Sequence, residues 1–234
     1  MQLVFDDVAF HRQGWSLRAS GTFRPGTHLV SGPVGSGKST LAMLASGLLA
    51  PAAGEVRRMG IGSTMLSLQF PEYHITGQTL AGEVASWGLN TERILREAGL
   101  QGREKEDPAW LSRGELKRLQ IACALAVPRD LLILDEPFSS LDCREKEALC
   151  GKLSTGPVGI TLLFTHEPWY LPRVDEIWVL ESGSLMALGQ TPGAIARWLR
   201  APDRIRDVLT SGITPAHISP ADLEEAVCRM HASG

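Results

Sequence analysis

The sequence predicts an α/β fold in which a mostly parallel sheet is flanked by helices. One observation is the apolar run at residues 131–134, which leads directly into two acids. That pattern is typical of a buried parallel strand that carries acidic side chains to its C-terminal end, the edge where open α/β sheets bind ligands. The other observation is a glycine-rich segment at residues 31–40, between a strand pattern at 26–30 and an apolar helix pattern.

The glycine-rich segment reads SGPVGSGKST and fits the phosphate-loop pattern G-x-x-x-x-G-K-[ST] from Gly32 to Ser39. Glycines let successive backbone N–H groups approach a polyphosphate, and the following helix points its positive end at the same anion. Lys38 would reach the β- and γ-phosphates, and the Ser39 hydroxyl would hold Mg²⁺. The alternative, a glycine turn that binds nothing, is disfavoured by the strand-loop-helix setting. The residues expected to bind the nucleotide here are Gly32, Pro33, Val34, Gly35, Ser36, Gly37, Lys38, Ser39 and Thr40.

The two acids after the 131–134 strand are Asp135 and Glu136. We expect Asp135 to hold the Mg²⁺ shell and Glu136 to polarise a water molecule, as in other phosphate-loop NTPases. A solvated acid pair without a catalytic role is the alternative, and it requires the upstream phosphate loop to be a coincidence. Two more segments stand at matching places: LSRGE at 111–115 opens a helix before the acids, and FTH at 164–166 ends a strand after them. Alone, each is a weak signal, because a single histidine such as His166 is more often a hydrogen-bonded structural residue.

Composition narrows the class of protein. With 234 residues, 44% of them hydrophobic and 21% charged, the chain is predicted to be globular, with one domain or two. Its formal net charge of -3 argues against a surface that coats nucleic acid. We expect no signal peptide, because MQLVFDDVAF carries acids, and no membrane span, because no apolar run approaches ~18 residues. The four cysteines form no CxxC pair and are expected to be free thiols in a reducing cytoplasm.

The N-terminal pattern predicts strands, and the middle of the chain predicts helices. Residues 2–30 read as short strands with turns at Gly14, Gly21 and Pro25-Gly26, which indicates an antiparallel sheet ahead of the phosphate loop. Within 79–99 we expect two short helices that part at Gly88, with Asn90 or Thr91 as the cap of the second.

The C-terminal half continues this alternation. A helix is expected over 113–127, and further strands at 158–164 and 176–180, with a hairpin turn at 181–184. The tail after residue 190 is predicted to be helical, with a last helix that has Ser219 as its N-cap and Pro220 at its first position.

Taken together, these segments resemble the ATP-binding-cassette (ABC) ATPases over roughly residues 1–190. In the order in which the family has them, the matching segments are 32–40 (Walker A), Gln69 (Q-loop), 111–115 (signature), 131–136 (Walker B), 140–142 (D-loop) and His166 (switch histidine). The resemblance implies an ABC ATPase domain at 1–190, with a short helical subdomain inserted at about 70–115, and a C-terminal helical extension at 191–234.

The resemblance also implies how the residues act on ATP and Mg²⁺. Two cassettes face each other head to tail, so a second ABC ATPase chain, identical or similar, is an expected partner. The signature of one chain closes on the ATP that the other chain's phosphate loop holds, and this gives Ser112, Gly114 and Glu115 a role toward the partner's nucleotide. The implied catalytic residues are Lys38, Gln69, Glu136 and His166, and the implied Mg²⁺ ligands are Ser39, Gln69 and Asp135.

The Q-loop stretch LSLQFPEYHITGQTL at 66–80 looks like that of energy-coupling-factor ATPases. Those ATPases drive uptake of vitamins or transition-metal ions through a membrane scaffold and a small substrate-binding membrane protein. The resemblance therefore implies these two membrane partners, a peripheral place at the cytoplasmic face of the membrane, and no nucleic-acid partner. His74 stands where a glutamine is more usual, and an ordinary surface loop is the alternative interpretation.

Several positions depart from the family pattern. Arg12 aligns where an aromatic residue stacks on adenine, so either its guanidinium stacks or Trp15 supplies the aromatic face. In the signature, Arg113 replaces a glycine and Glu115 replaces a glutamine, and Arg113 either faces the partner's ATP or is solvated. The intervals from Lys38 to Gln69 and from Gln69 to residue 111 are short for the family, which predicts a trimmed helical subdomain.

Three function classes follow. The leading one is an ATPase that powers import as a peripheral subunit on a membrane scaffold. A soluble cassette ATPase of repair, translation or cluster assembly would be expected to carry an insertion, an iron-sulfur domain or a second cassette. A scaffold that binds ATP without turnover is disfavoured by Lys38, Glu136 and His166. Small-molecule phosphotransferases with phosphate loops lack the signature and rank last.

Overall fold

One nine-stranded sheet organises the molecule, with strand order β4-β1-β2-β9-β8-β3-β7-β6-β5. The computed structural model describes residues 1–12, 14–155, 159–167 and 169–232. The strands are β1 (Gln2–Arg12), β2 (Trp15–Phe23), β3 (Gly26–Ser31), β4 (Ala53–Met59), β5 (Thr64–Ser67), β6 (Leu131–Asp135), β7 (Ile160–Thr165), β8 (Glu176–Glu181) and β9 (Ser184–Gln190).

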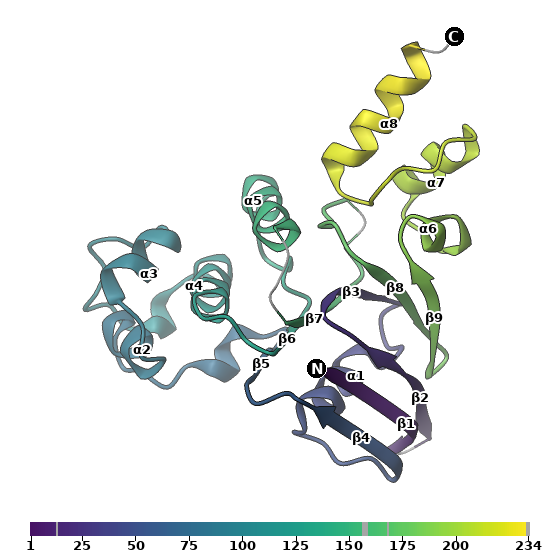
Figure 1. Ribbon diagram of the computed structural model, residues 1–234. Coiled ribbons are helices and arrows are strands. Elements are labelled where there is room, and N and C mark those ends of the chain that lie inside the picture. Colours follow the sequence, from purple (N-terminus) through teal and green to yellow (C-terminus); the bar gives the residue numbers. More distant parts are fainter. Residues whose placement is uncertain (13, 156–158, 168, 233–234) are drawn as a thin grey trace.

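The helices lie on both sides of this sheet and at its end (Figure 1). They are α1 (Lys38–Ser46), α2 (Leu80–Ser86), α3 (Thr91–Glu97), α4 (Arg113–Leu125), α5 (Cys143–Ser154), α6 (Gly193–Arg197), α7 (Asp203–Thr210) and α8 (Pro220–Ala232), with 3₁₀ turns η1 (Pro71–His74) and η2 (Pro108–Trp110). The predicted α/β class, with a mostly parallel sheet and flanking helices, is confirmed. No helix in the described part of the chain is long and apolar enough to cross a bilayer.

The sheet has a parallel half and an antiparallel half. Strands β3, β5, β6, β7 and β8 pair in parallel, whereas β1 pairs antiparallel with β2 and β4. The expected N-terminal antiparallel strands are therefore present. They join the parallel half through β9, which pairs with β2 at Arg18 and Ser184 and pairs antiparallel with β8. The sheet curls so that α1 is enclosed between the two halves (Figure 1).

The central strands divide their side chains between two cores. Because neighbouring residues of a strand point to opposite faces, Leu29 faces one core and Val30 the other. One core holds α1 and the antiparallel strands, and the other holds α5 to α8. The C-terminal helices thus share a core with the sheet through residues such as Trp198 and Leu223. The boundary at 190/191 remains a prediction.

A third, smaller core lies among α2, α3 and α4. The two expected short helices end and begin around Gly88, and Asn90 caps the second by accepting a hydrogen bond from the Arg93 N–H at 2.9 Å. These helices lie far from the C-terminal helices in Figure 1. The predicted helical subdomain at about 70–115 falls in this part of the chain and stays a prediction.

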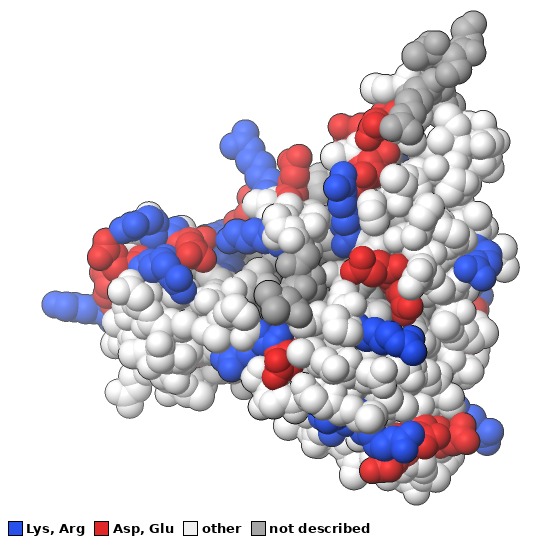
Figure 2. Space-filling model, viewed as in Figure 1, with Lys and Arg blue, Asp and Glu red and all other residues white. Residues whose placement is uncertain are grey.

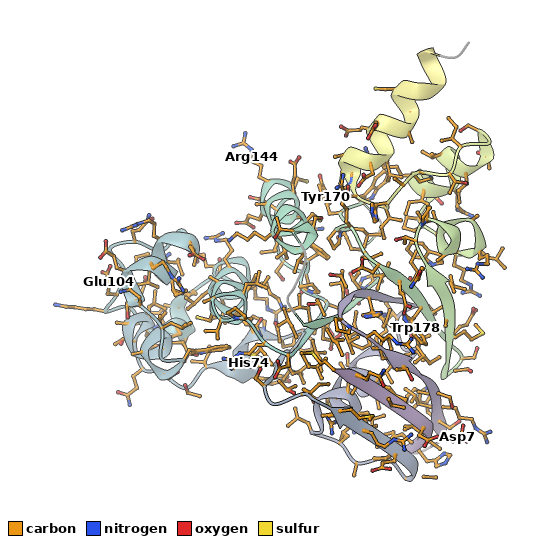
Figure 3. All side chains as sticks on the ribbon, viewed as in Figure 1. Asp7, His74, Glu104, Arg144, Tyr170 and Trp178 are labelled. Atoms are coloured by element: carbon orange, nitrogen blue, oxygen red, sulfur yellow. The ribbon has the colours of Figure 1, made fainter. Side chains whose placement is uncertain are left out.

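Some expected details were wrong. Gly21 lies inside β2, where a Cβ atom would stand only 2.7 Å from the ring of Trp178, so close packing and not a turn requires glycine there. Trp178, labelled in Figure 3, comes from β8 and packs against the antiparallel strands through Phe23. The helix expected to reach residue 127 ends at Leu125.

The last strands and the tail agree more closely with expectation. The strand predicted from residue 158 begins at Ile160, and residues 156–158 lie outside the described residues. The turn at 181–184 is present, with positive φ at both Ser182 and Gly183, the geometry of a tight hairpin. Ser219 precedes α8 as expected, and its hydroxyl accepts a hydrogen bond from the Asp222 N–H at 3.4 Å.

Candidate functional site

Four neighbouring strands bring the sequence-predicted residues to one edge of the sheet. The phosphate loop follows β3, Gln69 follows β5, Glu136 follows β6 and His166 follows β7. In the sheet these strands stand side by side in the order β3-β7-β6-β5, and they run parallel, so their carboxyl ends meet. A pocket of about 310 Å³ opens there, lined by Trp15, Val34, Gly35, Gly37, Lys38, Ser39, Thr40, Gln69, Glu136 and His166.

The phosphate loop depends on its glycines at two positions. Gly37 has a φ of 106°, and a Cβ there would stand 2.4 Å from the ring of Trp15. Gly35 has a φ of 82° with open space where a Cβ would stand. Both are backbone conformations that other L-residues adopt at a cost, and both leave the backbone N–H groups accessible to a bound anion. Gly37 is the N-cap of α1, whose positive end points at the pocket.

Lys38 is almost entirely buried, with 7% of its surface exposed. Its ammonium donates hydrogen bonds to the carbonyl oxygens of Gly32 at 2.8 Å and Pro33 at 3.1 Å, and lies 3.6 Å from a carboxylate oxygen of Glu136. The charge therefore stands at the mouth of the loop, where a β- or γ-phosphate would bind.

Glu136 is held in a strained backbone conformation. Its φ is 48°, a left-handed value that costs a residue other than glycine about 1–2 kcal/mol. The Thr165 hydroxyl donates to one carboxylate oxygen at 3.1 Å, and Nδ1 of His166 lies 2.6 Å from the other. The Glu136 N–H also donates to the Phe164 carbonyl at 2.8 Å. These contacts fix the carboxylate at the pocket, and strain of this kind is concentrated at functional sites.

Asp135 lies beneath the pocket and is 1% exposed. Burial raises the pKa of its carboxyl, and a hydrogen bond with Ser39 and the nearby Lys38 oppose that rise. Its Oδ1 atom is buried and has no hydrogen-bond partner among the described residues. A buried carboxylate oxygen without a partner, next to a serine hydroxyl, fits the oxygen ligands that Mg²⁺ prefers.

The structure separates the other expected residues from this pocket. Arg12 is exposed at the end of β1, opposite Trp15, and is not among the described residues that line the pocket, whereas Trp15 is. Ser36 is buried within the loop, and Gly32 and Pro33 line a second cavity. Of the two adenine-stacking alternatives, the geometry favours Trp15.

The signature residues also lie elsewhere in this chain. Ser112 caps α4: its hydroxyl accepts from the Glu115 N–H, and the Glu115 carboxylate accepts from the Ser112 N–H at 2.8 Å. Glu115 also pairs with Arg103, and these contacts lower the pKa of its carboxyl to about 2. A Cβ on Gly114 would stand 2.8 Å from the carbonyl oxygen of Ser140, so the start of α4 touches the D-loop. The structure thus gives Glu115 a capping role within its own chain.

Sequence reasoning missed two residues that hold this site together. Lys117, on α4, is 1% exposed, and its ammonium donates to the carbonyls of Leu68 at 3.1 Å and Gln69 at 2.9 Å. Thr165 orients Glu136, as described above. A lysine on a helix face that is otherwise apolar is a weak signal for such an anchor, because lysine stems often lie along apolar surface with the ammonium in water.

The Q-loop is anchored by a histidine as well. Nε2 of His74 accepts a hydrogen bond from the Leu68 N–H at 3.0 Å. Burial and then the Lys117 ammonium lower the pKa of His74, with Glu83 opposing, and the lowered pKa keeps the acceptor nitrogen unprotonated. A glutamine oxygen could accept the same bond, which accounts for the departure from the expected glutamine at this position. Figure 3 labels His74 below the helices of the subdomain.

Comparison with known proteins shows which family and which relatives the chain is similar to. Residues 18–139 match a family model described as ABC transporter. A putative ABC transporter ATP-binding protein of Pyrococcus horikoshii is 34% identical over 217 residues, covering 81% of this chain and 84% of that protein. The energy-coupling factor transporter ATP-binding protein of Thermotoga maritima is 34% identical over 212 residues, covering 79% of this chain and 80% of that protein.

Two further relatives show the breadth of the similarity. The aliphatic sulfonates import ATP-binding protein of Rhodococcus jostii is 34% identical over 181 residues, covering 73% of this chain and 70% of that protein. Among solved structures, an ATP-bound bacterial exporter of the Atm1 family superposes with a TM-score of 0.69 at 22% identity, covering 79% of this chain and 38% of that chain. The last similarity concerns the fold alone.

Proposed function

The chain belongs to the ABC transporter family of ATP-binding proteins, and from that premise we propose that it powers import as an energy-coupling-factor type subunit. Membership implies an ATPase, a membrane transporter as partner and a dimeric arrangement of ATPase chains. The finer proposal is uptake of a vitamin or a transition-metal ion, with the chain bound at the cytoplasmic face of the membrane. Similarity to ATP-binding proteins named for import or for energy-coupling factor transport supports it.

The residues of the pocket divide the work of hydrolysis among them. Lys38 and the backbone N–H groups of the phosphate loop bind the phosphates, and Trp15 stacks on the base. Ser39, Asp135 and Gln69 would hold Mg²⁺, which supplies neutralisation of the charge that develops on the transferred phosphoryl group. Glu136 accepts the proton of the attacking water, and His166 holds its carboxylate in place through the 2.6 Å contact.

The observation that carries the importer proposal lies just beyond Gln69. Phe70 and Tyr73 are 46% and 75% exposed, and their rings meet edge to face at 5.9 Å. Glu72 stands between them in the sequence. Exposed aromatic pairs beside an acid suit a short helix that carries an arginine, because aromatic side chains anchor interfaces and a carboxylate binds a guanidinium through two hydrogen bonds.

Glu72 already has a partner within the chain. Its carboxylate lies 3.4 Å from the guanidinium of Arg113, the residue that replaces a signature glycine, and both side chains are well exposed. Surface pairs of this kind contribute only about 0–1 kcal/mol, so an arginine from a membrane partner can replace Arg113. Arg113 thereby links the Q-loop to the start of α4. If an arginine of the membrane partner replaced Arg113 on Glu72, Arg113 would be released, and docking would be transmitted to the signature.

The test separates docking from catalysis. The double variant Glu72→Lys with Tyr73→Ala should keep nucleotide affinity and basal ATPase activity within about twofold, because neither residue lines the nucleotide pocket. It should lose co-purification with the membrane scaffold and lose uptake of radiolabelled vitamins or of nickel and cobalt ions in cells. A matched control, Glu55→Lys with Met59→Ala, changes an acid and an apolar residue on exposed positions of β4 and should behave as wild type. Wild-type uptake by the Q-loop double variant would refute this coupling surface and favour a soluble ATPase.

A further inference from the structure

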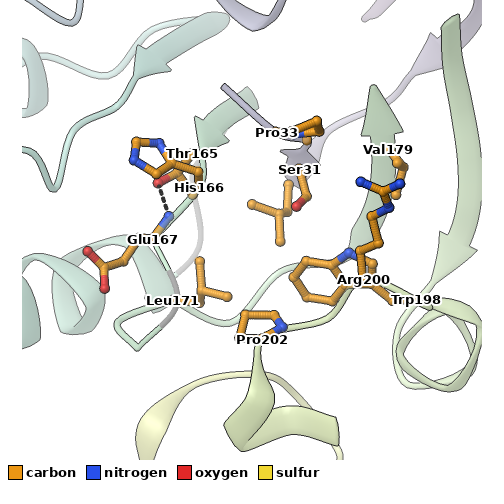
Figure 4. A pocket seen from close by; sticks show the side chains of 12 residues that line it. Ser31, Pro33, Thr165, His166, Glu167, Leu171, Val179, Trp198, Arg200 and Pro202 are labelled. Atoms are coloured by element: carbon orange, nitrogen blue, oxygen red, sulfur yellow. Dashed lines mark hydrogen bonds between the residues drawn. The ribbon is translucent and has the colours of Figure 1, made fainter. Parts of the chain in front are cut away.

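A second cavity, of about 280 Å³, lies on the far side of the phosphate loop from the nucleotide pocket. Residues 34, 35 and 37–40 line the nucleotide pocket, whereas Gly32 and Pro33 line this cavity, and His166 lines both. Its other walls come from the ends of β3, β7 and β8 and from the segment between α6 and α7 (Figure 4). Its volume is near the lower end of the roughly 300–1,000 Å³ of small-molecule sites.

Most of the wall is apolar. Leu29 and Val179 come from the sheet, Leu171 follows β7, and Pro33 and Pro202 close two further sides. An apolar wall with a few polar groups is the usual composition of a small-molecule site, because the apolar surface supplies binding energy and the polar groups fix the orientation of the ligand.

Two donors stand together at one end of the cavity. Trp198 is 3% exposed, and its indole N–H is buried without a hydrogen-bond partner among the described residues. Arg200 lies beside it (Figure 4). A buried donor without an acceptor is uncommon in folded proteins because it costs stability, so a ligand oxygen at this place would satisfy it.

Arg200 can turn toward a ligand. Its side chain is 64% exposed and pairs with Glu181, which is itself partly exposed. Such surface pairs are weak, so the guanidinium can exchange Glu181 for a carboxylate in the cavity and open the way to the indole N–H.

Glu167, the one acid among the described residues of the wall, does not oppose this. Glu167 accepts a hydrogen bond from the Lys146 ammonium at 2.7 Å and another from the Trp169 N–H at 3.0 Å. Its carboxylate points away from Arg200 and Trp198 in Figure 4. Arg200 is therefore the charged group that can turn to a ligand at this end of the cavity.

We propose that this cavity binds a small organic acid with an apolar body, and that the bound acid weakens ATP binding. The carboxylate would pair with Arg200 and the Trp198 N–H, while the hydrocarbon part lies against Leu29, Leu171 and Val179. One arginine among the described residues of a mostly apolar wall suits a monocarboxylate, whereas a phosphate would require more donors.

The coupling to ATP follows from the shared loop. The carbonyls of Gly32 and Pro33 accept two of the three N–H donors of the Lys38 ammonium, so Lys38 has to give up at least one of these bonds to hold both the β- and the γ-phosphate. An acid packed against Pro33 and His166 stabilises the arrangement in which those bonds exist. Linkage then requires that ATP weaken acid binding by the same factor, typically 5–150-fold.

Binding can be measured without nucleotide and without transport, so a failure here is distinct from a failure of the proposed function. We would titrate 3-phenylpropionate, with 3-phenylpropanol as its neutral counterpart, into the ¹⁵N-labelled chain and follow the indole N–H resonances. The Trp198 signal, assigned by its loss in Trp198→Phe, should shift saturably with the acid and far less with the alcohol. Arg200→Gln should weaken acid binding roughly tenfold or more, whereas Arg197→Gln, a change to an arginine outside the described cavity wall, should not.

Two controls make the result decisive. Lys38→Ala should still bind the acid, which separates this cavity from the nucleotide pocket. In wild type, saturating acid should raise the dissociation constant of ATP about fivefold or more, and Arg200→Gln should abolish that effect. A Trp198 resonance that does not respond to the acid would overturn the site and indicate water as the indole partner. A shift with unchanged ATP affinity would overturn the coupling.

Discussion

The phosphate-loop side of the molecule and the start of α4 differ in what each can do within one chain. On the phosphate-loop side, Lys38 and His166 each contact Glu136 at the wall of a pocket. Ser112 and Gly114, by contrast, cap a helix and touch the D-loop, and neither is among the described residues that line that pocket. The phosphate-loop side is a site formed within one chain. The start of α4 is a surface that the family arrangement would place over a second chain's nucleotide.

The difference has a physical cause. The residues on the phosphate-loop side follow adjacent parallel strands. The pairing of these strands fixes the distances between the residues at their ends. The signature begins a helix that packs mainly in a separate small core, so helix packing, and not strand pairing, sets the place of this unit. We infer that catalysis is assembled when that unit meets a partner's phosphate loop.

The largest expected effect concerns the phosphate-loop side. Glu136→Gln keeps the size of the side chain but removes its basicity, so turnover should fall by on the order of 10²- to 10⁴-fold, while ATP and Mg²⁺ binding persist. Lys38→Ala should instead lose nucleotide affinity. Steady-state ATPase rates and equilibrium nucleotide titrations distinguish the two.

A control and a trapped species complete this test. Glu55→Gln, at an exposed position on β4, should turn over at the wild-type rate. The Glu136 variant should accumulate an ATP-bound dimer, visible by light scattering coupled to size exclusion. Turnover within twofold of wild type in Glu136→Gln would remove this residue from the mechanism and leave the site without its base.

The second prediction tests the start of α4. If Ser112 acts on a partner's nucleotide, Lys38→Ala and Ser112→Arg should each be inactive alone and should recover activity when mixed. One of the two composite sites in a mixed dimer is then intact, so a random mixture should regain roughly a quarter of wild-type activity per chain. Specific activity should also fall on dilution as the dimer dissociates.

The control mixture pairs Lys38→Ala with a chain that carries both substitutions, because no dimer in that mixture holds an intact site. Recovery there would point to an artefact of mixing. Activity that stays strictly proportional to enzyme down to nanomolar concentration, with no recovery in the first mixture, would contradict a shared site and make the two regions independent.

The same comparison shows what the sequence could predict. Residues 32–40, Gln69, Glu136 and His166 follow strands, and a motif together with a strand is enough to place them at one edge of a sheet. Trp15 could only be offered as an alternative to Arg12, because a hairpin sets which of two facing side chains reaches the loop. Charged residues of the surface gave little indication of function. Figure 2 shows Lys and Arg interspersed with Asp and Glu over the face drawn.

Contacts that join elements distant in sequence escaped prediction. Arg113 is expected either to face ATP or to be solvated; its side chain is well exposed and also lies 3.4 Å from Glu72, a contact that neither alternative includes. The resemblance assigns Glu115 to a partner's nucleotide, which stays a prediction, and its pair with Arg103 within the chain is a contact that the motif does not reveal. Such pairings depend on how helices pack, which the periodicity of a sequence does not encode.

The smallest expected effect concerns Lys117, which ties the two regions together by binding the carbonyls of Leu68 and Gln69 from α4. Burial lowers the pKa of this lysine to about 8 from 10.5, with the acids Asp135, Glu72 and Glu136 opposing. Between these values the unfolded chain binds more protons than the folded one, so the folded state gains stability as pH rises through that window.

We expect the free energy of unfolding of wild type, relative to Lys117→Met, to increase between pH 8 and 10.5 by at most about 1.4 kcal/mol per pH unit. Urea unfolding of both chains at several pH values measures the difference, and Lys152→Met, at an exposed position on α5, should run parallel to wild type. Parallel curves for wild type and Lys117→Met would mean that the lysine titrates as in water, and that α4 is not bound to the Q-loop through a desolvated ammonium.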